Sequence, residues 1–435
     1  MKIYFIGIGG IGVSALAQYY LAKGNEIFGS DVCASEITEM LIKMGVKIII
    51  GPQKKENIQE SKYDLVIYSP AIREDNPELA EAKNLKIKCL SYPQALGELT
   101  KEHFTIAIAG THGKSTTTAM IALIMTKAGL DPTVIVGTKL KEFKNSNFRL
   151  GQSKYLVIEA CEHEESFLNY WPQIAVITNI EKDHLDYYKN LENIKLAFNK
   201  FADHIPENSF IIKNKEAEIK AKAKIIDFSI QDNSREAQEI KAILKIPGEY
   251  NVLNGLAALS VAKLLNIPEA TSLMALSEYY GVWRRFEITE LPNFTLIDDY
   301  AHHPTEIKAM LKSVREKYAN QKILCFFQPH QYQRTQFLWN DFISVFQQSL
   351  KEKWINDLIL LNVYDVAGRE GGEIYKNYNS CLLAEKIGEN CIFLENNNEL
   401  ENYFKDAKII ILMGAGDIYN LSLNIKSKYL GVCID

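Results

Sequence analysis

The chain has 435 residues, of which 47% are hydrophobic and 24% are charged, and its formal net charge is −5. One hydrophobic core does not serve so long a chain, and a prior of roughly 150 residues per domain predicts about three domains. The slightly acidic balance offers no basic surface for a nucleic-acid backbone or an anionic membrane. We therefore expect a globular, multi-domain protein of enzyme size with no nucleic-acid partner.

The N-terminus and the cysteines of the chain carry no targeting or disulfide signal. The N-terminus enters a strand-like run, Lys2–Ile6, without the basic region and long apolar stretch of a signal peptide. No segment approaches the ~20 apolar residues that span a bilayer. Seven cysteines are scattered without a C-x-x-C pair, which favours reduced thiols over a zinc site. These features predict a cytoplasmic protein without membrane insertion, either a monomer or a homodimer.

Short β-branched apolar runs alternate with helix-length amphipathic segments along the chain, which predicts an α/β protein with mainly parallel sheets. New buried-strand runs begin near residues 104 and 294. They divide the chain into three blocks, with boundaries near 99 and 290. Residues 213–245 are rich in Lys, Glu and Ala, and their weak periodicity assigns no element. The predicted strands are 3–6, 26–30, 46–50, 64–69, 86–90, 104–110, 155–160, 174–179, 294–300, 322–328, 357–363, 391–395 and 408–413; the later helices are 251–265 and 269–279.

The first glycine loop, Gly7–Gly12, matches G-x-G-x-x-G between a strand and a helix, and Asp31 ends the second strand. Glycines let the backbone approach a pyrophosphate, and the helix N-terminus supplies N–H donors and a positive dipole end. NAD is the default ligand of this pattern, but the motif does not distinguish NAD from a UDP-sugar. Asp31 is a candidate to hold a ribose or a base, or else it caps a turn.

The second loop, Gly110–Ser115, reads GTHGKS and is a shortened relative of the Walker pattern, with isoleucine at 108 in place of the usual first glycine. Backbone N–H groups would wrap the phosphates of ATP, Lys114 would neutralise their charge, and the Ser115 hydroxyl would ligate Mg²⁺. A plain capped glycine turn is the alternative, but lysine at a tight helix start opposes the dipole unless an anion is present. Two nucleotide-type loops predict two phosphorylated ligands, which a simple dehydrogenase does not need.

Acidic and histidine residues follow two later strands of the central block. Glu159 ends one predicted strand, and His184 lies in the segment that follows the next strand along the chain. Carboxyl ends of parallel strands meet at one edge of a sheet, where ligands bind. Glu159 and His184 are therefore candidate Mg²⁺ ligands beside Ser115, although a lone histidine on such a turn is more often a cap.

The third block concentrates polar, aromatic and cationic residues at two strand ends. Residues 298–306 read DDYAHHPTE and lead into a helix with Pro304 at its start, and residues 328–334 read QPHQYQR. Such a concentration predicts a binding site, although neither segment by itself names a reaction.

Together these segments resemble the Mur ligase family over essentially the whole chain and in the same order. Any one of them is weak, and the ordered set is specific. The segments that carry the resemblance are the GIGGIG start with Gly29–Asp31, Ala71–Ile72 with Asp75–Pro77, GTHGKSTTTA at 110–119, EA-x-E-x-x-x-SFL at 159–168, TNIEKDHLD at 178–186, Asn251 with Asn254, Arg284–Phe286, DDYAHHPTE at 298–306 and Gly414–Ile418.

The resemblance is closest to the family member that adds L-alanine to UDP-N-acetylmuramate, and it implies three α/β domains. These are a Rossmann-like UDP-substrate domain at 1–99, a central P-loop ATPase-like domain at 100–290 and a Rossmann-like amino-acid domain at 291–435. It also implies ATP and Mg²⁺, with attack of the lactyl carboxylate on the γ-phosphate and then of the L-alanine amine on the acyl phosphate.

The residue roles that the resemblance implies fall into five sets. They are Gly9, Gly10, Ile11, Gly12 and Asp31 for the UDP substrate; Gly110, Thr111, His112, Gly113, Lys114, Ser115, Thr116, Asn251, Asn254, Arg285 and Asp299 for ATP; Ser115, Glu159 and His184 for the metal; Tyr300, His302 and Arg334 for the amino acid; and Lys114, His184 and Arg334 for catalysis.

The sequence departs from the family pattern at several positions. Cys161 stands where an acidic residue is usual, Gln331 where an arginine is usual, and Pro52 or Gln53 where a histidine commonly contacts the uracil. Phe198 falls at the position of the carbamylated lysine of related ligases, so we do not predict that modification.

Three alternative functions stay open. One is the sister ligase that re-attaches a ready-made tripeptide to UDP-N-acetylmuramate, and a second is an NAD-dependent oxidoreductase built on Gly7–Gly12. A third is a non-catalytic relative, against which Lys114 and the metal set argue.

Overall fold

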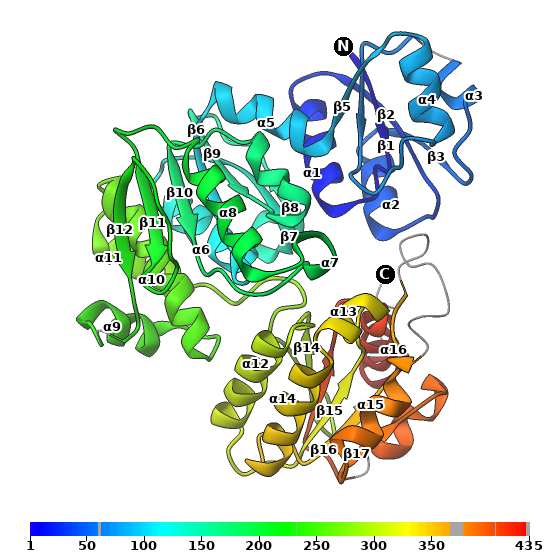
Figure 1. The fold of residues 1–435 in the computed structure, drawn as a ribbon, viewed down its shortest axis with the longest axis vertical. Coiled ribbons are helices and arrows are strands. Elements are labelled where there is room, and N and C mark those ends of the chain that lie inside the picture. Colours follow the sequence, from blue (N-terminus) through cyan, green and yellow to red (C-terminus); the bar gives the residue numbers. More distant parts are fainter. Residues whose placement is uncertain (60–61, 232, 366–376, 405, 432–435) are drawn as a thin grey trace. The chain divides into compact units, whose positions relative to one another are not determined.

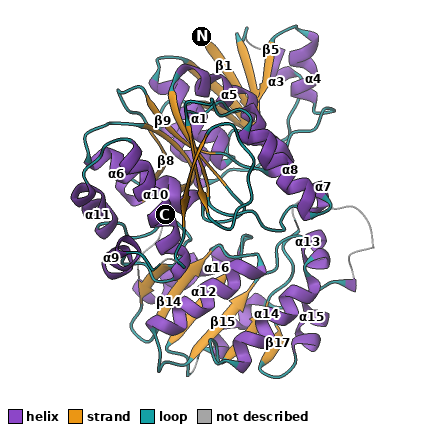
Figure 2. Cartoon of the chain, turned by 60° about the vertical axis from the view of Figure 1, so that its left-hand side comes forward, coloured by secondary structure: helices purple, strands orange, loops and turns teal. Residues whose placement is uncertain are grey.

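The computed structural model describes residues 1–59, 62–231, 233–365, 377–404 and 406–431 of the chain (Figure 1). Three β-sheets follow one another along the sequence, and helices cover them (Figure 2). Contacts divide the chain into two compact units. The first unit is Met1–Glu181, Glu192–Ile240 and Leu253–Ser277, and the second is Lys182–Leu191, Lys241–Val252 and Glu278–Asp435.

The first sheet has five parallel strands in the order β3-β2-β1-β4-β5. The strand order reverses between β1 and β4, and at such a switch point a doubly wound sheet opens a crevice for ligands. The strands are β1 (Lys2–Ile6), β2 (Glu26–Asp31), β3 (Lys47–Ile50), β4 (Leu65–Tyr68) and β5 (Lys88–Ser91), and the helices are α1 (Ile11–Ala22), α2 (Glu36–Lys43), α3 (Glu56–Gln59), α4 (Pro77–Asn84) and α5 (Tyr92–Glu102).

Side-chain caps set the starts of three of these helices, whereas α1 begins differently. Ser35 and Ser91 form capping boxes at α2 and α5, and Asn76 caps α4 with Pro77 at the first helical position. Gly10 precedes α1 without a side-chain cap among the described residues. The first N–H groups of α1 are therefore left for a ligand or for the surrounding loop.

The second sheet has seven strands in the order β12-β11-β10-β6-β9-β7-β8, and only the β7–β8 pair is antiparallel. The strands are β6 (Phe104–Ala109), β7 (Thr133–Leu140), β8 (Ser146–Arg149), β9 (Tyr155–Glu159), β10 (Ile174–Ile177), β11 (Phe210–Asn214) and β12 (Lys224–Phe228). The helices are α6 (Lys114–Lys127), α7 (Leu185–Tyr188), α8 (Leu191–Ala202), α9 (Arg235–Ile243), α10 (Glu249–Leu264) and α11 (Glu269–Ser277), with the 3₁₀ segments η1 (Lys141–Phe143) and η2 (His163–Asn169).

The third sheet has six strands in the order β13-β14-β18-β15-β16-β17, with β13 antiparallel to β14 and the other pairs parallel. One face packs against α12, α14 and α15, and the other face against α16. The strands are β13 (Glu287–Glu290), β14 (Thr295–Asp299), β15 (Ile323–Phe327), β16 (Asp357–Leu360), β17 (Cys391–Phe393) and β18 (Ile409–Met413), and the helices are α12 (Pro304–Lys317), α13 (Tyr332–Phe337), α14 (Trp339–Lys351), α15 (Ser380–Ile387), η4 (Asn397–Tyr403) and α16 (Ile418–Leu430).

The predicted fold class, three α/β sheets with mainly parallel strands, is confirmed, and each predicted strand has a counterpart within a few residues. The unassigned stretch 213–245 holds β12 and α9, and β7, β8, β11 and β13 also went unpredicted. The six described cysteines form no disulfide, and Cys433 lies outside the described residues. None of the described helices is long and apolar enough to cross a membrane.

One buried side chain in β8 fastens the helix that follows the first glycine loop to the second sheet. Asn147 is 3% exposed, and its amide group donates to the Ile11 carbonyl and, at 3.0 Å, to the Ser14 hydroxyl. Its amide oxygen accepts a 2.9 Å hydrogen bond from Gln18. Three positions of α1 are thus held by one residue of a strand far along the chain.

We expect Asn147→Ala to lower the free energy of unfolding by about 1–3 kcal/mol, because it leaves buried polar groups of α1 without their partner. Urea unfolding followed by circular dichroism measures the change. The matched control, Gln152→Ala on the exposed loop after β8, should stay within about 0.5 kcal/mol of the parent. An Asn147→Ala protein as stable as the control would contradict the proposed link.

Candidate active site

The loop between β6 and α6 has a shape that only glycine permits at two positions. Gly110 and Gly113 have φ angles of 135° and 82°, in the range that other residues rarely adopt. A Cβ atom on Gly110 would lie 2.0 Å from the Thr178 hydroxyl oxygen, and one on Gly113 would lie 2.5 Å from the Asn254 side-chain oxygen. The loop is therefore packed tightly against its neighbours while Gly113 leads directly into α6.

The end of the neighbouring strand β10 holds this loop in place. The Thr178 hydroxyl donates to the His112 carbonyl at 2.5 Å, and the Asn179 side-chain oxygen accepts from the His112 N–H at 2.9 Å. The Asn179 carbonyl accepts from the Thr111 N–H at 3.2 Å. These contacts place the loop at the carboxyl edge of the sheet, where the first N–H groups of α6 favour an anion.

Lys114 is the cationic residue of this loop, and both backbone carbonyls and a carboxylate bind its ammonium group. Its ammonium donates to the carbonyls of Gly110 and Thr111 at 2.6 and 3.2 Å, and to the two carboxylate oxygens of Glu162 at 2.9 and 3.2 Å. The Glu162 side chain is only 3% exposed. Burial lowers the pKa of Lys114, but the Glu162 carboxylate raises it more, so the net pKa lies above the ordinary lysine value and the side chain stays charged.

Two of the three metal candidates lie in the first unit. Ser115 is in the first turn of α6, and Glu159 ends β9, which pairs with β6 in register. The Glu159 carboxylate accepts a 2.6 Å hydrogen bond from the Gly137 N–H. A hydroxyl and a carboxylate are oxygen donors of the kind that Mg²⁺ takes, so the chemistry of these two side chains suits the ion; their role as its ligands stays a prediction.

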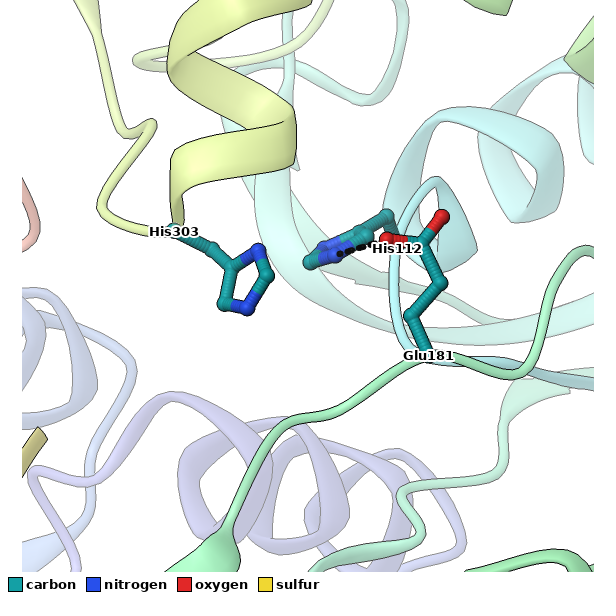
Figure 3. A group of neighbouring side chains, drawn as sticks. All are labelled: His112, Glu181 and His303. Carbon is teal, nitrogen blue, oxygen red and sulfur yellow. Dashed lines mark ion pairs between the residues drawn. The ribbon is translucent and has the colours of Figure 1, made fainter. Parts of the chain in front are cut away.

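His112 forms an ion pair with Glu181, shown by the dashed line in Figure 3, with 3.7 Å between the ring nitrogen and the carboxylate. Glu181 is also tied to the loop by its backbone, since its N–H donates to the Thr111 hydroxyl at 2.9 Å. The segment after β10 thus braces the phosphate loop at two successive residues, Thr111 and His112.

The first glycine loop is held mainly by β2. The N–H groups of Gly7 and Ile8 donate to the Ser30 carbonyl at 2.9 and 3.1 Å, and the Gly9 N–H donates to the Asp31 carboxylate at 2.8 Å. Gly12 lies against the ring of Tyr92, where a Cβ would be 2.8 Å from the nearest ring carbon. In this structure Asp31 shapes the loop through Gly9; its predicted contact with the UDP substrate stays a prediction.

The third metal candidate, His184, belongs to the second unit. It has a left-handed φ of 50° just before α7, and its imidazole lies 3.7 Å from the Asp183 carboxylate. Asp183 also lies 3.5 Å from the Arg334 guanidinium. Burial raises the pKa of Asp183, but His184 and Arg334 lower it more, so it lies well below the ordinary value and the carboxylate stays ionised.

The predicted amino-acid residues Tyr300, His302 and Arg334 form one connected cluster. The rings of Tyr300 and His302 are 5.3 Å apart, and the rings of His302 and His330 are 6.1 Å apart. The Arg334 guanidinium lies 3.1 Å from the His330 ring nitrogen. Burial lowers the pKa of His302 to about 4, against the opposite effect of Glu306, so its imidazole is neutral at physiological pH.

Arg285 and Asp299, both predicted to reach ATP, lie next to this cluster. The Arg285 guanidinium is 3.3 Å from the Glu306 carboxylate and 5.1 Å from the Tyr300 ring centre. Asp299 accepts hydrogen bonds from the N–H groups of Phe286 and Ala301 at 2.8 and 2.7 Å. Burial raises the pKa of Asp299 to about 6, although Arg285 acts in the opposite sense.

The histidine after His302 fixes the start of α12 and the segment before α7. His303, also drawn in Figure 3, caps α12 by accepting the Thr305 N–H at its Nδ1 atom. Its Nε2 atom lies 2.8 Å from the Lys182 carbonyl. Because Nδ1 accepts, the neutral imidazole carries its proton on Nε2 and donates it to that carbonyl.

The two asparagines of α10 fall in different units. Asn254, in the first unit, accepts a 3.1 Å hydrogen bond from the Thr117 hydroxyl and packs on Gly113, so it touches the phosphate loop. Asn251, in the second unit, donates to the Pro247 carbonyl at 2.6 Å. Both side chains are buried.

Three carboxylates of the site, Glu162, Asp183 and Glu306, had no role predicted from the sequence. Each is a carboxylate that pairs with a predicted binding cation, respectively Lys114, Arg334 and Arg285. Each lies inside one of the sequence motifs that carry the family resemblance, at 159–168, 178–186 and 298–306. That location was the one feature of the sequence that could have pointed to them.

Comparisons with known proteins agree with these observations. Three Mur ligase models match the chain: the family's catalytic domain at residues 2–104, the middle domain at 108–262 and the glutamate ligase domain at 284–416. A Clostridium tetani protein named UDP-N-acetylmuramate–L-alanine ligase is 41% identical, with 96% of each chain covered. A protein of the same name from Acetivibrio thermocellus is 40% identical, covering 96% of this chain and 94% of the relative.

Solved structures extend the likeness to three dimensions. The crystal structure of UDP-N-acetylmuramate–alanine ligase from Thermotoga maritima superposes with a TM-score of 0.80 at 30% identity, over 99% of both chains. A murein peptide ligase from Psychrobacter arcticus has a TM-score of 0.73 at 24% identity over 99% of both chains, which shows the shared fold. The chain belongs to the Mur ligase family.

Proposed function

We propose that the chain joins L-alanine to the lactyl carboxylate of UDP-N-acetylmuramate, with conversion of ATP to ADP and phosphate. The observation that carries this proposal is the charged, partly buried Lys114 in a glycine loop at the start of α6, on a chain whose relatives at 38–41% identity bear the alanine ligase name. The loop supports binding of a nucleoside triphosphate, and the relatives' name supports the acceptor and the amino acid.

We assign the residues of the second sheet to ATP. Lys114 would counter the charge of the phosphates and Ser115 and Glu159 would hold Mg²⁺, which when bound supplies further charge neutralisation. His184 is our third proposed ligand. Gly110–Thr116, Asn251, Asn254, Arg285 and Asp299 are the proposed ATP contacts.

The proposed reaction has two steps whose atoms balance. A carboxylate oxygen attacks the γ-phosphorus, which gives an acyl phosphate and releases ADP. The L-alanine amine then attacks the acyl carbon, the amide bond forms, and phosphate leaves with the bridging oxygen. Tyr300, His302 and Arg334 would position the amino acid, with Arg334 suited to its carboxylate because a guanidinium offers a paired set of donors.

The proposed domains are 1–99 for the UDP substrate, 100–290 for ATP and 291–435 for the amino acid. Gly9–Gly12 and Asp31 lie at the switch point of the first sheet, which supports a diphosphate there. The tripeptide ligase is less favoured, since its structural relatives are 24% identical and show the fold alone. An NAD-dependent oxidoreductase leaves Lys114 and its loop without a role.

Phosphate release from ATP tests the acceptor and the amino acid. We expect release to require UDP-N-acetylmuramate, L-alanine and Mg²⁺ together, and to fall to background when any one of them is omitted. The comparison arm replaces L-alanine with the tripeptide L-alanyl-D-glutamyl-diaminopimelate. Release with the tripeptide and none with L-alanine would refute the proposal.

Lys114→Ala should lower kcat by about 10²–10³-fold, because it removes the cation that opposes the charge developing on the transferred phosphoryl group. The control is Lys127→Ala, on the exposed last turn of the same helix, which should keep kcat within about twofold of the parent. Steady-state phosphate release gives both values. Equal turnover in the two variants would remove Lys114 from the proposed site.

A further inference from the structure

The first sheet buries a carboxylate that neither the motifs nor the proposed reaction uses. Glu78, in the first turn of α4, is 0% exposed. Its carboxylate accepts hydrogen bonds from the Ser30 hydroxyl at 2.5 Å, the Asn57 amide at 2.6 Å and the Tyr4 phenol at 3.2 Å. These donors come from β2, α3 and β1, three separate segments of the first sheet's surroundings.

The partners of Glu78 that the structure describes are neutral. Burial raises the pKa of Glu78, and the hydrogen bonds from Ser30, Asn57 and Tyr4 oppose that rise. A buried carboxylate of this kind is costly compared with an apolar side chain of similar size. Packing alone therefore does not account for a glutamate at this position, where one of its partners, Tyr4, belongs to a hydrophobic core cluster.

The shortest of these hydrogen bonds comes from Ser30, the residue whose carbonyl also binds the first glycine loop. Ser30 uses its hydroxyl for Glu78 and its carbonyl for the N–H groups of Gly7 and Ile8. The next residue, Asp31, accepts the Gly9 N–H. Glu78 thus fixes Ser30, and Ser30 with Asp31 fixes three successive N–H groups of the loop.

Further hydrogen bonds connect Glu78 and Ser30 to the loop after β3. Asn57 donates to Glu78, and the Lys54 backbone also hydrogen-bonds to the Glu78 carboxylate. Gln53 donates to the Ser30 hydroxyl at 3.4 Å and accepts from Asn76. The carboxylate therefore joins the ends of β2, β3 and β4 at the edge where the switch-point crevice opens.

We propose that Glu78 is a positioning residue for the UDP substrate: through Ser30 it sets the place of the Gly7–Gly9 backbone, which leads into the proposed diphosphate loop Gly9–Gly12. This inference rests on the proposed function, because it takes that loop as the UDP site. Glu78 acts through Ser30 and is not itself a catalytic residue.

The test is the Glu78→Gln variant, which keeps the size of the side chain and replaces one acceptor oxygen with a donor. Either Ser30 or Asn57 then faces an NH₂ group, so the charge-assisted bond to Ser30 is lost or weakened. We expect the KM for UDP-N-acetylmuramate to rise about tenfold, in line with loss of one hydrogen bond to a charged group. The KM for MgATP and kcat should stay within about twofold, because their proposed residues lie on the other sheets.

Glu81→Gln is the matched control, since Glu81 lies one turn further along α4 and bonds only to the exposed Gln59 among the described residues. It should leave all three constants unchanged. Ser30→Ala should reproduce the selective rise, and the double variant Ser30→Ala with Glu78→Gln should be no worse than either single change, because both remove the same bond. Ser30→Ala also decides the matter if Glu78→Gln does not fold.

An unchanged KM for UDP-N-acetylmuramate in Ser30→Ala or in a folded Glu78→Gln would overturn the inference. Equal losses in kcat and in both KM values would also overturn it, since they would indicate a general structural role. Failure of the proposed function is recognised separately. In that case the parent protein itself shows no saturation with UDP-N-acetylmuramate.

Discussion

Pairing of the partly buried Lys114 ammonium with its neighbours is the interaction on which the proposed ATP site depends. A buried cation is stable only with partners, and here two loop carbonyls and the Glu162 carboxylate supply them. The carbonyls belong to a loop whose two left-handed glycines let it fold around the ammonium. Thr178 and Asn179 then hold that loop from the next strand. An arriving triphosphate therefore meets a cation and helix N–H groups that are already in place, so little reorganisation is needed when charge develops.

The same arrangement recurs in the second unit, where Arg334 and Arg285 are paired with Asp183 and Glu306. Each of the three cations assigned to an anionic ligand thus has a poorly exposed carboxylate beside it. The pairing keeps each cation charged and oriented, and it limits the charge that the site carries without substrates. The first sheet differs, because its buried carboxylate Glu78 is bound by neutral donors and shapes backbone N–H groups instead of a cation.

The features that could be predicted from the sequence were those encoded in a short run of neighbouring residues. Buried strands such as Phe104–Ala109 and Thr295–Asp299 were recognisable because each has a run of apolar residues followed by a glycine loop or a polar segment. The strands β8 and β12 were missed because SNFR is mostly polar and KIIDF is largely exposed at a sheet edge. The two glycine loops, each between a strand and a helix, were likewise recognisable. The roles of Glu162, Asp183 and Glu78 were not, because their partners lie far away in the sequence and meet them only in the folded chain.

The central claim is that the lactyl carboxylate is activated by transfer of the γ-phosphoryl group. Ligation with UDP-N-acetylmuramate in which both lactyl carboxylate oxygens are a heavy isotope, followed by mass analysis of the released phosphate, tests it most directly. The account predicts that each phosphate acquires one labelled oxygen, because the attacking carboxylate oxygen leaves with phosphorus when the amine displaces it. Phosphate free of label, formed together with the amide product, would contradict the account.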